Sequence, residues 1–167
     1  MAAITTPVPA TSCRVHEMLG LGVTGAMDVG AGWAGFLYAM HTADAFIRAG
    51  SHRTILVVGA ECLTRVTDYT DRRTCILFGD GAGACVVTGH GSLELIHSAI
   101  GADGTQRDLI HIPAGGSRTP ASCDTVAAGQ HFLKLDGRRV FKHAVRRMTE
   151  AAERAMAATG LTRDDFA

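Results

Sequence analysis

The chain has 167 residues, 47% of them hydrophobic and only 19% charged, which excludes a disordered or fibrous protein and suits one folded domain with a sizeable core. The 16 basic and 16 acidic residues balance, so net charge gives no reason to expect a nucleic-acid or acidic-membrane partner. No apolar run approaches the ~18 residues that span a bilayer, the first residues lack a signal-peptide pattern, and the five cysteines form no CxxC pair. Together these features predict a reduced, cytoplasmic protein.

The first part of the chain predicts a helix, a strand and a second helix. Thr11 is expected to cap a helix that runs to Leu19 and is ended by Gly20. The apolar segment 25–29 predicts a short buried strand. Residues 33–49 are nearly all small or apolar, which is typical of a helix that is covered on all sides.

The next segments have the composition of strands. Residues 54–61, TILVVGAE, form the continuous apolar run of a central strand covered on both faces. Residues 75–88 predict two strand halves joined by a glycine-rich middle, in which Asp80 is expected to accept structural hydrogen bonds. Residues 92–101 predict a further strand.

The last third combines a long loop with an amphipathic helix. Residues 102–130 are expected to be loop-like, and 131–135 to be a short strand. A helix is predicted from Asp136 or Gly137 to about Thr159, because apolar residues recur there at three- and four-residue spacing. The pattern begins and ends within an alternation of strands and helices, which indicates one piece of a larger α/β assembly.

Residues 28–40, DVGAGWAGFLYAM, have the pattern of a nucleophile elbow, in which a turn of small residues leads from a strand into a buried helix. A cysteine at such a turn would have its pKa lowered by the unsatisfied N–H groups of the helix N-terminus. Trp33, the only tryptophan, stands there instead, and an indole offers an N–H donor but no nucleophile. From periodicity alone, a side chain that fills the core is the favoured interpretation of Trp33.

Other motifs give no competing site. GLGVTG at 20–25 matches a dinucleotide fingerprint, but it follows a helix and precedes a strand, the reverse of the order that such a site needs. The eight histidines show no metal-ligand spacing. The sequence therefore predicts neither a metal nor a bound cofactor.

Several motifs, in the same order, are similar to those of the β-ketoacyl-acyl-carrier-protein synthase III family, condensing enzymes of the thiolase superfamily. The matching segments are TSCRVHEMLGL, DVGAGWAGFLYAM, LVVGAECLTRVTDYTDRRTCILFGDGAGACVV, DGTQRDLIHIPAGGSRTPAS and FLKLDGRRVFKHAV. The resemblance covers nearly the whole chain and implies an α/β thiolase-like fold, layered α-β-α-β-α when complete. Residues 1–167 would then be the middle of such an enzyme, with 1–90 ending its N-terminal half and 91–167 beginning its C-terminal half.

Members of this family move an acyl group from acyl-coenzyme A to a cysteine and condense it with malonyl-acyl carrier protein in fatty acid biosynthesis. The resemblance implies an acyltransferase that works as a homodimer, has acyl-coenzyme A and acyl carrier protein as partners, and needs no cofactor, since coenzyme A thioester is a substrate. It places the nucleophile at Trp33. The family's histidine and asparagine belong to a later segment that this sequence does not include, so the chain itself is expected to be inactive.

The resemblance also assigns binding residues. Arg72 matches an arginine that stacks on the adenine of coenzyme A, a role that suits a planar guanidinium, and Phe78 matches a phenylalanine of the acyl pocket. The wall of the coenzyme channel is matched by Leu135, Gly137, Arg138 and Phe141. Lys142 matches the surface that docks the acidic carrier protein. For Arg146 and Arg147, a solvated helix face is the favoured interpretation.

Alternatives stay open for several of these assignments. Apart from the resemblance, Arg72 is equally a solvated loop residue, and Phe78 and Phe141 are equally parts of a core. Two further functions are compatible with Trp33 and this fold. One is a non-catalytic subunit that pairs with a cysteine-bearing condensing enzyme, and the other is an acyltransferase of secondary metabolism.

Overall fold

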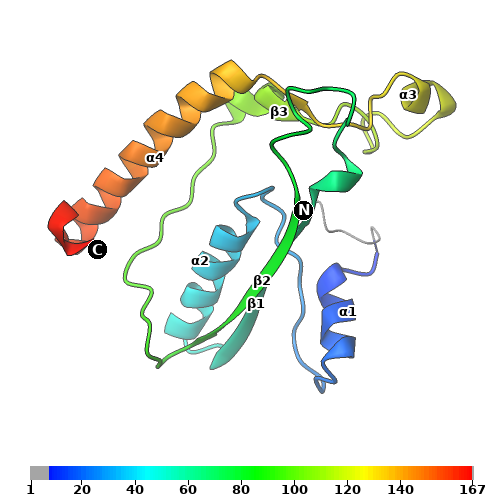
Figure 1. Ribbon diagram of the computed structural model, residues 1–167. Coiled ribbons are helices and arrows are strands. Elements are labelled where there is room, and N and C mark those ends of the chain that lie inside the picture. Colours follow the sequence, from blue (N-terminus) through cyan, green and yellow to red (C-terminus); the bar gives the residue numbers. More distant parts are fainter. Residues whose placement is uncertain (1–7, 167) are drawn as a thin grey trace. The chain divides into compact units, whose positions relative to one another are not determined.

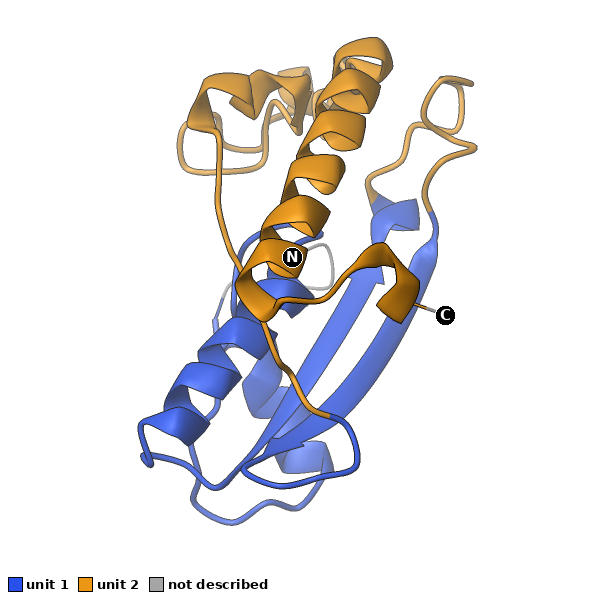
Figure 2. Ribbon diagram, turned by 90° about the vertical axis from the view of Figure 1, so that its left-hand side faces the viewer, with its two compact units in different colours: residues 1–65, 79–93 blue, residues 66–78, 94–167 orange. Residues whose placement is uncertain are grey.

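The computed structural model describes residues 8–166, which divide into two compact units (Figure 2). Unit 1 consists of the described residues up to Arg65 together with Gly79–Leu93. Unit 2 consists of Val66–Phe78 and the described residues from Glu94 onward. The helices and strands carry labels in chain order in Figure 1.

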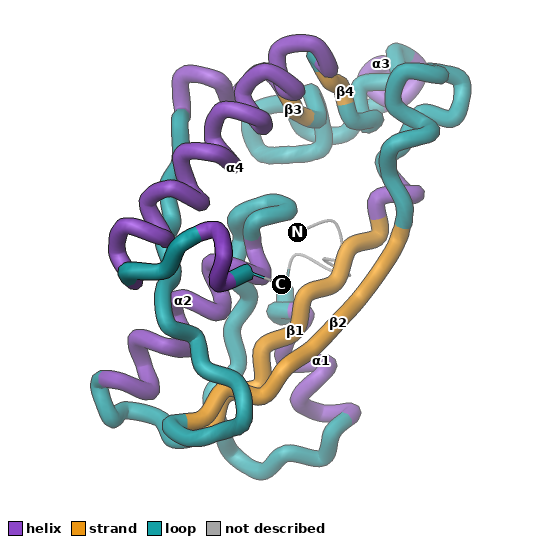
Figure 3. Tube along the Cα trace, turned by 60° about the vertical axis from the view of Figure 1, so that its left-hand side comes forward, coloured by secondary structure: helices purple, strands orange, loops and turns teal. Residues whose placement is uncertain are grey.

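Unit 1 is built from helices on an antiparallel pair of strands. Its elements are α1 (Thr11–Met18), α2 (Gly35–Arg48), β1 (Thr54–Cys62), the 3-10 helix η1 (Leu63–Arg65) and β2 (Asp80–Thr88). The strands β1 and β2 pair along their whole length, from Thr54 opposite Thr88 to Cys62 opposite Asp80 (Figure 3). Helix α2 contacts both strands, so it packs on one face of the two-stranded sheet.

Strand β1 confirms the strand expected at 54–61, but not its burial on both faces. Val57 is buried at 4% exposure, whereas its neighbours Leu56 and Val58 are 40% and 43% exposed. Successive side chains of a strand point to opposite faces. Since β1 pairs only with β2 in the described chain, Leu56 and Val58 lie on the open face of a two-stranded sheet.

Residues 25–29, expected as a strand, join no sheet of the described chain. Instead the Asp28 carboxylate accepts hydrogen bonds from the N–H groups of Thr11 and Ser12, both at 2.8 Å. Partial burial raises the pKa of Asp28, but the hydrogen bonds from Ser12 and Thr11 outweigh it and lower the pKa. The N-cap of α1 is Ala10, which offers no side-chain acceptor. Asp28, and not Thr11 as predicted, therefore satisfies the first N–H groups of this helix.

Helix α2 lies within the predicted range 33–49 and is followed by Gly50, whose φ is +70°. The expectation that it is buried on all sides is wrong for this structure, because Ala43 is its one buried residue and Leu37 is 63% exposed. The sheet of unit 1 covers one side of the helix.

Gly59 lets α2 and β1 approach closely. A Cβ atom at Gly59 would lie 3.1 Å from Cδ2 and 3.3 Å from Cβ of Phe36, in the first turn of α2. Gly83, its partner across the ladder, would place a Cβ in open space. The contact between the start of α2 and β1 thus depends on the missing side chain at Gly59.

Strand β2 begins only at Asp80, so residues 75–79 do not form the first strand half that was predicted. Asp80 accepts hydrogen bonds from the Thr64 N–H at 2.9 Å and from the Thr64 hydroxyl at 2.7 Å. These bonds lower the pKa of Asp80 and confirm its predicted role as a structural acceptor.

Unit 2 consists of short elements and one long helix. They are η2 (Gly104–Leu109), β3 (Ile110–His111), α3 (Cys123–Ala127), β4 (Lys134–Leu135), α4 (Gly137–Thr159) and η3 (Arg163–Asp165). Strands β3 and β4 pair antiparallel, with Ile110 opposite Leu135. The predicted loop 102–130 therefore contains regular elements, whereas residues 92–101, expected as a strand, have no regular secondary structure.

Helix α4 confirms the predicted amphipathic helix within about one residue at its start. Asp136 is its N-cap, and the Asp136 side chain accepts the Arg139 N–H at 3.2 Å. Gly160 ends the helix with a φ of +74°, a conformation that glycine adopts without strain. No helix among residues 8–166 is both long and apolar enough to cross a membrane.

Candidate functional site

The residues assigned by the sequence are divided between the units. Trp33 belongs to unit 1, and all the residues assigned to coenzyme A and to the carrier protein belong to unit 2. Unit 2 therefore holds a candidate binding site that can be described on its own.

Trp33 lies in the tight turn that precedes α2. Gly32 has a φ of +57°, and the Gly35 N–H donates to the Gly32 carbonyl at 2.9 Å, which closes the turn. Ala34, the N-cap of α2, offers no side-chain acceptor to the first N–H groups. The Trp33 side chain is 43% exposed, so it does not fill the core of unit 1. The turn and the helix of the predicted elbow are present, whereas the strand that should lead into them is not.

Two backbone hydrogen bonds hold the candidate residues of unit 2 together. The Leu133 N–H donates to the Val66 carbonyl at 2.8 Å, which ties the loop of residues 66–78 to the segment before β4. The Asp136 N–H donates to the Leu109 carbonyl at 2.9 Å, which fixes the start of α4 on η2. The loop that carries Arg72 and the start of α4 therefore belong to one anchored framework.

Arg72 and Arg73 are adjacent in sequence but differ in their surroundings. The Arg73 guanidinium binds Asp71 through two hydrogen bonds, Nε to Oδ1 at 2.9 Å and Nη2 to Oδ2 at 3.1 Å. These bonds are the main reason why the pKa of Asp71 is lowered. The Arg72 side chain is exposed and, among residues 8–166, makes no hydrogen bond or ion pair. Of the two, Arg72 is the guanidinium that a ligand can reach without first breaking an ion pair.

Most basic side chains at the start of α4 are engaged by other side chains. Arg139 donates to Gln106 Oε1 at 3.2 Å. Arg146 and Arg147 both pair with Glu150, at 3.7 Å and 2.9 Å. Their charges are locally compensated, which agrees with the predicted solvated face for Arg146 and Arg147.

Arg138 and Lys142 are the exceptions on this helix segment. Neither side chain has a hydrogen bond or an ion pair within the described part of the chain. They are four residues apart, so they share one side of the helix. Phe141, beside Lys142, is 70% exposed, and Leu135 on β4 is half-buried. A Cβ atom at Gly137 would meet only Leu135 Cδ2, at 4.0 Å, so the backbone there is open to a neighbouring group.

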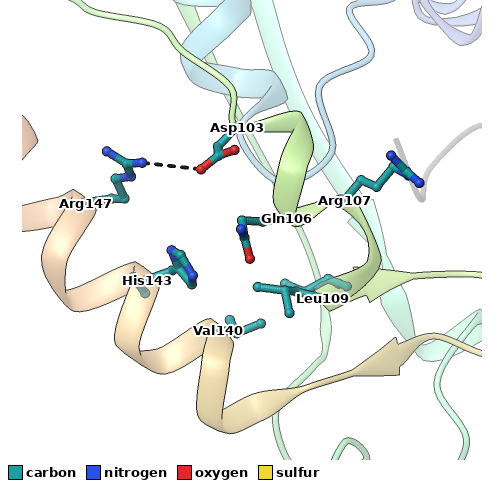
Figure 4. A pocket seen from close by; sticks show the side chains of 9 residues that line it. Asp103, Gln106, Arg107, Leu109, Val140, His143 and Arg147 are labelled. Atoms are coloured by element: carbon teal, nitrogen blue, oxygen red, sulfur yellow. Dashed lines mark hydrogen bonds and ion pairs between the residues drawn. The ribbon is translucent and has the colours of Figure 1, made fainter.

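A cavity of about 370 Å³ between η2 and α4 was not predicted from the sequence (Figure 4). Leu109 and Val140 form an apolar part of its wall, and Asp103 and Arg147 face each other across it at 3.4 Å. The sequence holds one signal for this feature, because Asp103 precedes Gly-Thr and accepts the Thr105 N–H at 3.1 Å as the cap of η2. None of the residues assigned by resemblance lines the cavity.

The residues of unit 2 that the resemblance assigns to ligands are of types suited to binding. Arg72, Arg138 and Lys142 offer positive charge without a protein partner, and Phe141 and the half-buried Phe78 offer apolar surface. Guanidinium groups bind phosphates and stack on aromatic rings. Among residues 8–166, no three His, Cys, Asp or Glu side chains gather as they do around a metal ion.

Comparisons with known proteins agree on one family. The family model for 3-oxoacyl-[acyl-carrier-protein (ACP)] synthase III matches residues 27–104. Beta-ketoacyl-[acyl-carrier-protein] synthase III of Chlamydia caviae is 43% identical over 95% of this chain and 48% of its own length. The protein of the same name from Chlamydia trachomatis serovar D is 45% identical over 95% of this chain and 49% of its own length.

Solved structures of synthase III enzymes and of a related ketosynthase are similar to this chain in fold. A 3-oxoacyl-(acyl-carrier-protein) synthase III superposes with a TM-score of 0.85 at 29% identity, covering 96% of this chain and 51% of its own. The enzyme of Pseudomonas aeruginosa gives 0.81 at 34% identity, over 93% and 48%. The priming β-ketosynthase of the R1128 polyketide pathway gives 0.80 at 34%, over 95% and 46%. The fold is thiolase-like α/β, as the sequence predicted, and the chain spans about half the length of these relatives.

Proposed function

Because the chain belongs to the 3-oxoacyl-acyl-carrier-protein synthase III family, we propose that its fold serves the cytoplasmic condensation of an acyl-coenzyme A primer with malonyl-acyl carrier protein in fatty acid biosynthesis. The part of this chain is to bind the substrates. It does not carry out the acyl transfer, since an indole at residue 33 cannot form a thioester. No cofactor is required, because the coenzyme A thioester is itself a substrate.

One observation carries the binding proposal: each cationic side chain assigned to a ligand lacks a hydrogen bond and an ion pair among residues 8–166, although a basic neighbour of each is paired. Arg72 is without an ion pair although its neighbour Arg73 has one. Arg138 and Lys142 are without one although Arg146 and Arg147 have theirs. We propose that Arg72 stacks on the adenine of coenzyme A. The phosphates and the pantetheine chain of coenzyme A would then lie along Arg138 and the channel wall. Phe78 would contact the acyl group, and Leu135, Gly137 and Phe141 would complete that wall.

Replacement of Arg72 by alanine is expected to weaken coenzyme A binding about tenfold, which corresponds to the ~1–3 kcal/mol of stacking on one base. Fluorescence anisotropy of etheno-coenzyme A with the chain measures this. Arg154→Ala is the matched control, because Arg154 is an exposed arginine twelve residues beyond Lys142, about 18 Å further along α4. Equal affinities of the Arg72→Ala variant and the wild type would rule out the stacking role.

Lys142 is proposed to dock the acidic carrier protein, together with Arg138. Charge reversal in Lys142→Glu is expected to weaken acyl carrier protein binding by about 1 kcal/mol or more at low salt, and by less at high salt, because exposed charges are screened. Surface plasmon resonance at two salt concentrations measures both effects. Arg118→Glu, an exposed arginine in the loop before α3, serves as the control. A loss of the same size in both variants would show a nonspecific effect of net charge.

A second function is favoured by Trp33 itself: a non-catalytic subunit that pairs with a cysteine-bearing condensing enzyme of the same fold. Co-purification of the chain with such an enzyme from its source would support this pairing. A pure homodimer, which we propose for the family function, would count against it. An acyltransferase of secondary metabolism would need the same nucleophile and meets the same objection at residue 33.

A further inference from the structure

Asp71 fixes the backbone on both sides of Arg72. Its carbonyl accepts the N–H groups of Thr74 and Cys75, both at 3.0 Å, and the Thr74 hydroxyl at 3.2 Å. Its own N–H donates to the Asp68 carbonyl at 3.1 Å. Thr74 is 2% exposed, so the turn is anchored by a buried side chain directly after the two arginines.

The Asp71 carboxylate closes the same turn from the solvent side. It accepts the Arg73 N–H at 3.0 Å in addition to the two bonds from the Arg73 guanidinium. The Arg73 side chain is 86% exposed and that of Asp71 is 25% exposed. The charged partner of Arg73 is thus supplied from within the turn, and Arg72 is the residue of the turn 71–74 whose side chain has no partner among the described residues.

An exposed ion pair of this kind contributes little to the stability of a fold. It can still matter for binding, because a guanidinium held on a fixed backbone loses less conformational freedom when a ligand orders it. We infer that Asp71 is a positioning residue. Its ion pair with Arg73, here called the clamp, holds the turn in the conformation that exposes Arg72 to coenzyme A. This inference rests on the proposed binding role of Arg72.

The direction in which Asp71→Ala changes the affinity for coenzyme A distinguishes a positioning role from a purely electrostatic one. Coenzyme A carries phosphates, so removal of a nearby carboxylate should strengthen its binding on grounds of charge alone. If Asp71 positions Arg72, Asp71→Ala weakens etheno-coenzyme A binding instead, about threefold to fivefold, at little cost in thermal stability. Asp71→Asn keeps an acceptor for the Arg73 N–H and should recover part of the loss. Asp68→Asn removes an equal charge from the same loop but keeps an acceptor for the Thr70 N–H, so it is the matched control.

A double-mutant cycle provides the decisive comparison. In the Arg72→Ala background, Asp71→Ala is expected to change the affinity no further. Additive losses would overturn the inference, as would tighter binding by Asp71→Ala alone.

A second measurement needs no ligand. Phenylglyoxal should modify Arg72 faster than Arg73 in the wild-type chain, and Asp71→Ala should raise the Arg73 rate to that of Arg72, as read by tandem mass spectrometry. Equal rates in the wild type would overturn the clamp whatever the binding data show. Unequal rates combined with no effect of Arg72→Ala on affinity would retain the clamp, but they would contradict both the proposed role of Arg72 and the positioning role of Asp71.

Discussion

The variant Trp33→Cys is expected to carry a thiol that reacts with iodoacetamide at neutral pH about tenfold faster than the native exposed cysteines, Cys13 and Cys123. Residue 33 precedes the N-cap Ala34, and α2 has no side-chain cap. The N–H groups of a helix start lower the pKa of a nearby thiol, and one pKa unit changes the thiolate fraction about tenfold.

The native cysteines are matched controls, because both also lie at helix starts whose N–H groups are already engaged. Cys13 is in the first turn of α1, where Asp28 accepts the bonds. Cys123 begins α3, which has a capping box formed by Ser122 and Thr125. A rate for the introduced thiol no higher than for these two would show that the turn does not activate a nucleophile.

The same variant is also expected to take an acetyl group from acetyl-coenzyme A, which intact-mass and peptide analysis would place on residue 33. The wild type should take none, and Trp33→Ser should take far less. An acetyl group found on native cysteines instead would contradict the assignment of residue 33 as the nucleophile position.

The variant Gly59→Val is expected to lower the free energy of unfolding by about 1–3 kcal/mol, the usual cost of forcing extra atoms into a packed contact. A Cβ atom there would lie 3.1 Å from Phe36 Cδ2, and valine adds two further methyl groups. Urea denaturation followed by circular dichroism measures the change. Because Phe36 is in the first turn of α2, the substitution also displaces the helix start that follows Trp33.

Gly83→Val tests whether the loss arises from this contact. Gly83 lies directly opposite Gly59 on the ladder and would place its Cβ in open space, while valine suits a strand. We expect little or no destabilisation there. Truncation of Phe36 to alanine should recover part of the loss in Gly59→Val, and equal losses at both glycines would show that Phe36 is not the cause.

Features with a local cause were predictable from the sequence. The apolar periodicity of residues 137–159, together with Asp136 at one end and Gly160 at the other, defines α4 without reference to the rest of the chain. The run 54–61 likewise predicted β1. Its burial was not predictable, because burial depends on which elements lie against each face of the sheet.

Residues 25–29 and 92–101 were wrongly predicted as strands, because their composition suits a strand but neither segment has a pairing partner in the described chain. A strand exists only where another strand pairs with it, and neither segment joins a ladder in the described chain. At 25–29 the Asp28 carboxylate instead accepts hydrogen bonds from the N–H groups of Thr11 and Ser12, over a sequence separation that no periodicity reveals. The short elements of 102–130 were missed because two to six residues carry no periodic signal.

For the candidate site, the sequence predicted which residue types are present. It did not predict which basic side chains are already paired with a carboxylate. Arg72 and Arg73 are chemically identical in the sequence, and only the contacts of Asp71 distinguish them. Lys142 and Arg146 are both basic and lie one helical turn apart, but only Arg146 pairs with Glu150. Such differences depend on side-chain geometry, which a pattern of residue types does not specify.

We propose above all that unit 2 carries a binding surface for coenzyme A. The most direct test is a titration of the ¹⁵N-labelled chain with coenzyme A, followed by backbone amide chemical shifts. We predict that the shifts change at Arg72, Leu135 and Arg138 and stay constant along α1, Thr11–Met18. Changes absent from these three residues at saturating ligand, or confined to unit 1, would contradict a coenzyme A surface on unit 2.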